Sequence, residues 1–83
     1  MDALDGNAIA GSLFEHFGSE MTSVPGDCKH CGTRSLIAEL AVYTRAPGAV
    51  ARCPACGNVV MVVVKTRGST EVHAEAFELR EST

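Results

Sequence analysis

The sequence predicts a small antiparallel β fold with an N-terminal α-helix, held together by four cysteines. Three observations support this prediction. The cysteines form two pairs of the same spacing, Cys28 with Cys31 and Cys53 with Cys56. Apolar and β-branched residues dominate the segments between and after the pairs, whereas residues 7–17 show helical periodicity. The chain has only 83 residues, and domains of this size commonly need a metal ion or disulfides to supplement a small core.

We expect one domain over residues 1–83, whose N-terminal helical region covers residues 1–21. The helix itself should occupy residues 7–17, with Asp5 or Asn7 as its N-cap. Gly18 follows at the position where a left-handed C-cap favours glycine. The apolar side chains that recur at helical spacing are Leu13, Phe14, Phe17 and Met21. This apolar stripe must pack either on the rest of its own chain or on a partner, which includes a homo-oligomer formed through the helix.

Residues 22–83 should form the β part of the fold, with a C-terminal β-hairpin. We expect a strand over residues 36–43, a turn at residues 46–48 and a return strand over residues 49–52. In the first strand, alternation gives one face to Leu36, Ala38, Leu40 and Val42, and the other to Ile37, Glu39, Ala41 and Tyr43.

Further strands are expected after the last cysteine. The β-branched run at residues 59–64 predicts a buried strand, and Gly68 marks a hairpin turn within residues 65–70. Residues 71–77 fit a return strand, but the apolar spacing over residues 71–79 fits a helix as well. Residues 80–83 are expected to fray.

The two cysteine pairs have the spacing of metal ligands. Two intervening residues let one tight turn direct both sulfur atoms at the same ion, and zinc prefers four ligands in a tetrahedron. Gly32 and Gly57 directly follow the pairs, where the chain must turn away and its amides can point back at the sulfurs. Zinc is the expected ion, and iron is the alternative because four tetrahedral sulfurs suit both. The predicted ligands of this single metal ion are Cys28, Cys31, Cys53 and Cys56.

Other uses of paired cysteines fit the sequence less well. The N-terminus lacks the basic start and apolar run of a secretory signal, and the longest apolar run, residues 59–64, is too short to span a membrane. We therefore expect a cytoplasmic protein, in which cysteines stay reduced and serve as metal ligands or redox groups rather than disulfides. A thioredoxin-type pair would begin a helix, and neither pair leads into a helical pattern.

The histidines are not expected to be ligands. His30 lies between the first two cysteines, where the side chain generally points away from the ion that its neighbours share. His16 falls on the polar side of the predicted helix, and His73 has no evident partner.

Composition argues against most enzymatic and nucleic-acid functions. The formal net charge is −3 at pH 7 and the seven Lys and Arg residues are scattered, whereas nucleic-acid affinity depends on clustered cations. No nucleophile with a base and no phosphate-binding loop is evident. Four thiolates would also close the zinc shell, whereas catalytic zinc keeps one position open. We therefore expect a non-enzymatic structural zinc protein whose partner is another protein.

Two alternative functions stay open. The first is a redox protein, either an iron electron carrier or a thiol sensor that releases zinc on oxidation. The second is a nucleic-acid-binding ribbon in transcription or translation, which the acidic charge places last.

The two Cys-x-x-Cys-Gly turns, the second with Pro54, resemble the knuckles of rubredoxins, which are small iron electron carriers, and of zinc ribbons in transcription and ribosomal proteins. The aromatic core and the longer spacing of rubredoxins are missing. Over nearly its whole length the chain resembles a small, mostly actinobacterial family that is catalogued as a domain of unknown function. The segments that carry this resemblance are residues 4–11, 20–22, 39–48 and 52–57. The resemblance implies a zinc-ribbon body with an N-terminal helix and no established activity.

Overall fold

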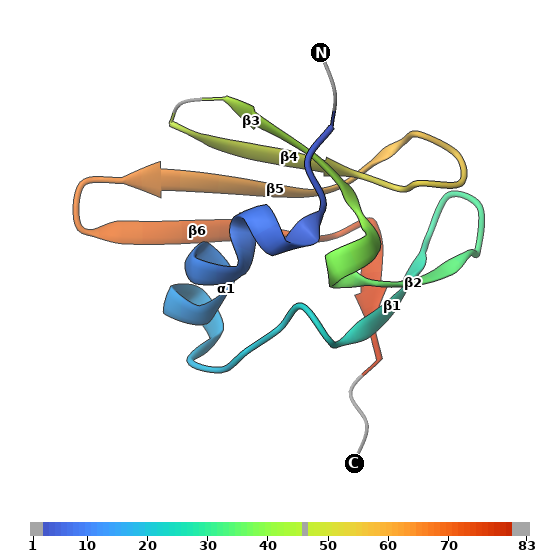
Figure 1. Ribbon diagram of the computed structural model, residues 1–83, viewed down its shortest axis with the longest axis horizontal. Helices are drawn as coiled ribbons and strands as arrows, with labels where there is room; N and C mark the ends of the chain where they lie inside the picture. The colour runs from blue at the N-terminus through green and yellow to red at the C-terminus, as the bar shows by residue number, and fades with distance from the viewer. Residues whose placement is uncertain (1–2, 46, 81–83) are drawn as a thin grey trace.

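The computed structural model describes residues 3–45 and 47–80, which form two antiparallel β-sheets and an N-terminal helical segment (Figure 1). The smaller sheet has the strand order β2-β1-β7 and the larger has the order β3-β4-β5-β6. This arrangement confirms the predicted small antiparallel β fold with one N-terminal α-helix. The strands are β1 (Pro25–Cys28), β2 (Arg34–Leu36), β3 (Ala41–Arg45), β4 (Gly48–Arg52), β5 (Val59–Thr66), β6 (Ser69–His73) and β7 (Phe77–Leu79). The helical segments are η1 (Gly6–Ile9), α1 (Ala10–Phe17) and η2 (Ile37–Glu39).

The helix predicted over residues 7–17 is a 3-10 turn, η1, that continues into α1. Asp5 caps its start, because the side chain accepts a hydrogen bond of 3.0 Å from the Asn7 amide. Gly18 ends it with a φ of 78°, in the left-handed conformation that the sequence predicted. Both ends of the helical segment are therefore set by local sequence.

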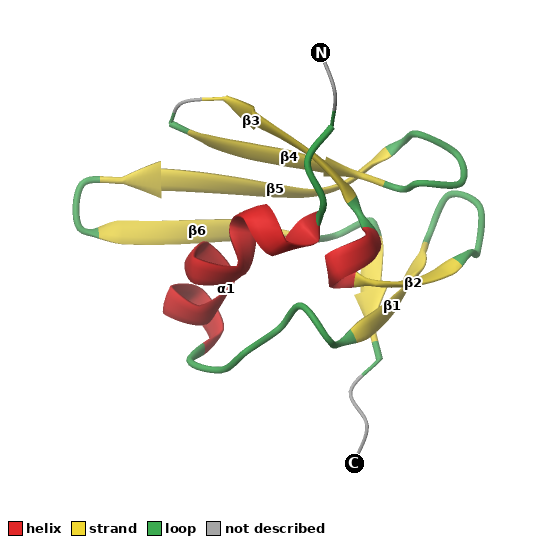
Figure 2. Cartoon of the chain, in the orientation of Figure 1, coloured by secondary structure: helices red, strands yellow, loops and turns green. Residues whose placement is uncertain are grey.

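One side of α1 packs on its own chain. Leu13 is fully buried, and α1 lies against β6 (Figure 1). η1 lies beside η2 (Figure 2). Phe14 and Phe17 are on the outside, 55% and 39% exposed. The predicted apolar stripe is thus divided between the core and the surface.

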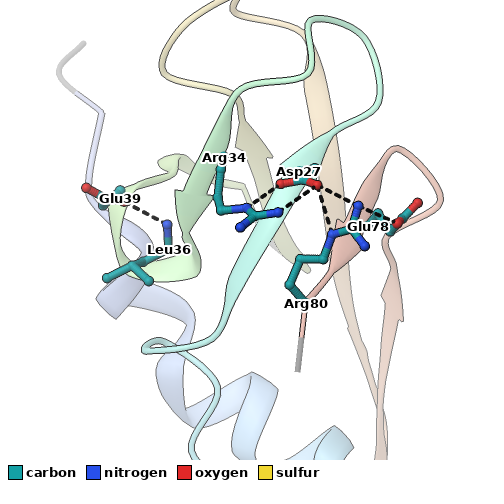
Figure 3. A network of polar contacts seen from close by, with 6 residues as sticks. All are labelled: Asp27, Arg34, Leu36, Glu39, Glu78 and Arg80. Atoms are coloured by element: carbon teal, nitrogen blue, oxygen red, sulfur yellow. Dashed lines mark hydrogen bonds and ion pairs between the residues drawn. The ribbon is translucent and has the colours of Figure 1, made fainter. Parts of the chain in front are cut away.

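The prediction of a single strand over residues 36–43 is wrong, because the chain there forms β2, η2 and β3, in two different sheets. The Glu39 carboxylate accepts a hydrogen bond of 2.7 Å from the Leu36 amide and favours the 3-10 turn (Figure 3). The Ile37 amide donates to the Val24 carbonyl at 3.0 Å. This hydrogen bond to a residue just before β1 holds the turn in place. As a result Ile37 is fully buried and Leu36 is 40% exposed, although Leu40 and Val42, which were predicted to share a face with Leu36, are buried. The predicted division into two faces therefore fails at the 3-10 turn.

The strands predicted directly before and after the second cysteine pair are confirmed, whereas the return strand predicted over residues 71–77 is right only as far as His73, where β6 ends. β4 and β5 contain the predicted segments 49–52 and 59–64, and β5 and β6 form the predicted hairpin with Gly68 in its turn. Of the predicted turn at residues 46–48, residue 46 lies outside the described residues, and Gly48 already begins β4. Residues 71–79 are not a helix, because β6 ends at His73 and β7 follows in the other sheet.

Asp27 connects all three strands of the smaller sheet (Figure 3). Its carboxylate accepts a hydrogen bond of 2.8 Å from Arg34 on β2, and one of 2.9 Å from Arg80, which follows β7. These contacts, with Arg34 first, hold the pKa of Asp27 at about 2, below its usual value of 3.8. The Arg80 amide also donates to the Pro25 carbonyl at 2.7 Å. The prediction of fraying is therefore wrong at residue 80, and residues 81–83 lie outside the described residues.

One hydrophobic core lies among the helical segments and both sheets. It includes side chains from the N-terminal segment, from β5 and from β7, together with two of the four cysteines, Cys28 and Cys53. The cysteine pairs are consequently anchored in the core and not in free surface loops. Among the residues that the structure describes, no helix has both the length and the apolar character that a membrane crossing requires.

Replacement of Gly26 by alanine should destabilise the protein. A Cβ at Gly26, in the central strand of the smaller sheet, would overlap the ring of Phe77. We expect Gly26→Ala to lower the free energy of unfolding by about 1–3 kcal/mol, a typical cost of overpacking a core. The control is Gly11→Ala in α1, where a Cβ meets nothing within 4 Å and where alanine should stabilise the helix by up to about 1 kcal/mol. Urea unfolding of both variants checks this, and equal effects would contradict it.

Loss of the Asp27 charge should weaken the smaller sheet. Because the pKa of Asp27 is lower in the folded state than its usual value, its ion pairs stabilise the fold above about pH 4 and are lost as the pH falls towards 2. We therefore expect Asp27→Asn to lower the melting temperature by the same amount at about pH 8 and about pH 6, and by less in high salt. Asp5→Asn is the control, because asparagine caps a helix as well as aspartate and should leave the melting temperature unchanged.

Candidate metal centre

The two cysteine pairs lie in the turns of two different sheets. The first knuckle, residues 28–33, connects β1 to β2 in the smaller sheet. The second knuckle, residues 53–58, connects β4 to β5 in the larger sheet. The two turns lie side by side at the right-hand edge of the molecule (Figure 1). The site is therefore a junction between the two sheets.

The two knuckles have the same backbone hydrogen bonds. In the first, the Cys28 amide donates to the Thr33 carbonyl at 2.9 Å, and in the second the Cys53 amide donates to the Asn58 carbonyl at 2.9 Å. Each glycine amide also donates to the carbonyl of the first cysteine in its knuckle. Gly32 and Gly57 have φ values of 78° and 79°, a conformation that glycine adopts without a steric penalty. The predicted turn at these two glycines is thereby confirmed, but their amides bond to cysteine carbonyls and not to the sulfurs as expected.

The four sulfur atoms form one cluster, in which every Sγ lies within 4.8 Å of the others. Two contacts cross between the knuckles, Cys28 with Cys56 and Cys31 with Cys53, and in both the Sγ atoms lie 3.7 Å apart. Four sulfurs at the corners of a tetrahedron around zinc, at about 2.3 Å from the ion, would lie about 3.8 Å from one another. The arrangement therefore fits a tetrahedral metal ion, and the four cysteines together could hold one.

Burial divides the ligands in the same way in both knuckles. The first cysteine of each pair is buried, with Cys28 only 1% and Cys53 only 2% exposed, whereas Cys31 and Cys56 are exposed. One side of the cluster thus borders the hydrophobic core and the other side faces solvent.

Polar side chains contact the two exposed sulfurs. The Thr33 hydroxyl lies 3.3 Å from Cys31 Sγ, and the Asn58 side-chain amide donates to Cys56 Sγ at 3.4 Å. The hydrogen bond with Thr33 lowers the pKa of Cys31 to about 6, and hydrogen bonds from the backbone and side chain of Asn58 lower the pKa of Cys56. Both contacts favour the thiolate, which is the form that binds a metal.

Cys53, on the buried side of the cluster, has the opposite electrostatic character to the exposed cysteines. Burial raises the pKa of Cys53 to about 11, although the Ala55 amide donates a hydrogen bond to its sulfur at 3.4 Å. A metal ion must therefore displace the proton of Cys53 at neutral pH. Consequently the affinity of the site for a metal should increase with pH.

The sulfur cluster as described contains no histidine. His30 is exposed on the first knuckle, and His16 makes a hydrogen bond of 3.0 Å to the Thr70 carbonyl on β6. His73, for which the sequence suggested no partner, lies 3.8 Å from Glu75. The site residues that the sequence predicted are therefore brought together, and the three histidines lie elsewhere.

A family model matches residues 1–81, which is nearly the whole chain. The chain belongs to DUF6510, a family of unknown function. No curated protein and no solved structure matches the chain. The DUF6510 match spans both knuckles and confirms the resemblance to an uncharacterised family, whereas its actinobacterial membership stays a prediction.

Thr33 and Asn58 of this DUF6510 chain are site residues that the sequence analysis missed. They occupy equivalent positions, each directly after the glycine that follows a cysteine pair. The sequence contained a pattern that could have predicted these two residues, because in both pairs the second cysteine is followed by glycine and then by a residue with a side-chain hydrogen-bond donor. What the sequence did not show is that each side chain turns back to the sulfur two residues before it.

Removal of the Thr33 hydroxyl should weaken metal binding. We expect Thr33→Val to raise the dissociation constant for zinc by about 10-fold or more, the usual effect of losing a hydrogen bond to a metal ligand. Thr33→Ser keeps a hydroxyl and should bind nearly as well as the unaltered protein. Thr44→Val, at an exposed position of β3, is the control and should leave the dissociation constant for zinc unchanged. Competition with a chromophoric chelator measures all four affinities, and equal values for Thr33→Val and Thr44→Val would contradict the role.

Proposed function

We propose that this protein is a non-enzymatic zinc ribbon, in which Cys28, Cys31, Cys53 and Cys56 bind one structural zinc ion. The observation that carries the proposal is the convergence of four sulfurs from the turns of two different sheets. A tetrahedral ion at this point would fix the two sheets to each other and would leave no ligand position open for a substrate. The role of the metal is then to hold the fold, and not to do chemistry.

The small size of the protein supports a structural role for the ion. Domains of this length gain little stability from their core alone, and structural zinc can contribute on the order of 10 kcal/mol to folding. In a reducing cytoplasm the thiols would be free to bind the ion, and cytoplasmic location is part of the proposal. Cys31 and Cys56 lie on the exposed side of the cluster, so an iron ion bound there would, like zinc, be close to solvent. Four tetrahedral sulfurs suit both ions. Iron is therefore the alternative that the first experiment must address.

The proposed biological role is to present a surface to another protein. Phe14 and Phe17 are exposed on α1 although Leu13 in the same helix is fully buried. Exposed aromatic side chains of this kind are enriched in protein–protein interfaces. This feature supports an accessory or interaction module, whose partner could be a larger protein or a second copy bound through the helix.

The proposal is tested by the metal content, visible spectrum and melting curve of the purified native protein. We expect one zinc ion per chain, no visible colour, and a cooperative unfolding transition. Cys53→Ser should abolish stoichiometric zinc and the cooperative transition, because it removes a buried ligand. His30→Ala lies in the first knuckle and is the control, expected to keep both zinc and the melting temperature.

Two outcomes would overturn the proposal. One iron ion per chain with charge-transfer colour would make the protein a candidate electron carrier. A Cys53→Ser variant that melts like the unaltered protein would show that no structural metal depends on this cysteine.

A further inference from the structure

From Met61 to Val64, β5 is apolar on both of its faces, although the described chain packs its core on only one of them. Val60 is buried as well, but it lies at the register shift between β4 and β5. Met61 and Val63 point to the core and are buried. Val62 and Val64 point the other way and are only partly buried, and neither belongs to the core cluster. An antiparallel sheet with one face in water normally alternates apolar and polar residues. The absence of this alternation in β5 indicates that the second face also contacts protein.

The register of the four strands identifies the residues of that second face. Tyr43, Val50, Val62 and His73 lie opposite one another in one row across β3, β4, β5 and β6. Arg45, Gly48, Val64 and Glu71 form the next row. The outer sheet face is defined here by Tyr43, Arg45, Val50, Val62, Val64 and Glu71.

In the row of Arg45, Gly48, Val64 and Glu71, the two charged side chains lie at opposite edges of the outer sheet face and have opposite signs. Arg45 is on edge strand β3 and Glu71 is on edge strand β6, in the same row. The two strands are three strand spacings apart, or about 14 Å, so these side chains cannot pair within one molecule. Among the described residues neither takes part in a salt bridge, whereas Arg52 on the same face donates to the Gly57 carbonyl at 2.8 Å.

We propose that the outer sheet face binds the outer sheet face of a second copy of this chain. A twofold axis parallel to the strands, above the line between β4 and β5, places β3 of one copy over β6 of the other. Arg45 of each copy then meets Glu71 of the other, and the valines of β4 and β5 meet at the centre. Sheets that pack face to face lie about 10 Å apart, a distance that arginine and glutamate side chains can bridge.

Charge complementarity selects the second copy over other partners. An acidic partner would be attracted by Arg45 but repelled by Glu71, and a basic partner would meet the reverse problem. A complementary partner must carry a negative charge opposite Arg45, a positive charge opposite Glu71 and apolar residues between them. A second copy that is turned by the twofold axis presents its own surface in this order. Four strands of five to eight residues bury on the order of 1,000 Å² in such a pair, near the lower limit for a specific interface. The dimer is therefore weak and concentration-dependent.

This inference goes beyond the interaction role proposed above, because it uses a different surface from α1, and it does not depend on which metal is bound. The native, metal-bearing protein is examined by sedimentation equilibrium from about 10 μM to about 1 mM, a range suited to an interface of this size. We expect the mass to rise from that of the 8.7 kDa monomer towards twice this value. Arg45→Glu and Glu71→Arg should each raise the dimer dissociation constant about tenfold or more, because each creates two like-charge contacts in the dimer.

The decisive variant is the double charge swap, Arg45→Glu with Glu71→Arg, which restores opposite charges only across the interface. It should return the dissociation constant to near that of the unaltered protein. Arg67→Glu, in the turn after β5, makes the same charge change off the face and is the matched control.

Three results would overturn the inference: a monomer throughout the range, a dimer that neither single variant weakens, or a double swap no better than the singles. Circular dichroism and metal content are measured on every sample. A monomer that contains zinc would thus reject the dimer and leave the zinc proposal intact. A dimer that contains no metal would support the dimer and reject the zinc proposal.

Discussion

The convergence of two hairpin turns on one cluster of sulfur atoms is the constraint on which the rest of this structure depends. The first knuckle belongs to the smaller sheet and the second to the larger sheet, so their contact fixes how the sheets are placed. Cys28 and Cys53 extend this junction into the hydrophobic core, where they are part of the same cluster as Met61 and Phe77. Sulfur cluster and core are therefore one continuous unit, and a change in either should be felt by the other.

The two knuckles have the same local structure because each meets the same requirements. Each must turn the chain sharply, direct two sulfurs to one side and keep its backbone amides bonded. A glycine with positive φ, an amide returned to a carbonyl and a polar side chain on the exposed sulfur meet these needs in both turns. The result is a site in which burial raises the pKa of Cys53, whereas hydrogen bonds lower the pKa of the exposed Cys31 and Cys56.

The larger sheet shows how a small chain distributes a limited number of apolar residues. α1 and η1 supply side chains to one face, and the other face keeps valines and Tyr43 without a helix of its own to cover them. Among the described residues α1 is the one α-helix, and we propose above that a second copy of the chain supplies the layer over the other face. This shortage connects the modest size of the protein with the surface through which we expect it to associate.

Local sequence by itself determined the four-cysteine pattern, the glycine C-cap of the helix, the turn glycines of the knuckles and the existence of the β4–β5–β6 strands. These features depend on spacing and on backbone conformations that only certain residues adopt, so they can be read without the fold. The tertiary structure decided the break between β2 and β3, because the Ile37 amide bonds to Val24, far from it in sequence. It also decided that residues 71–79 divide between two sheets, and which face of β5 is covered. A run of six apolar residues carries no alternation, and only the packing of the helical segments and the other strands selects which side chains of β5 are buried.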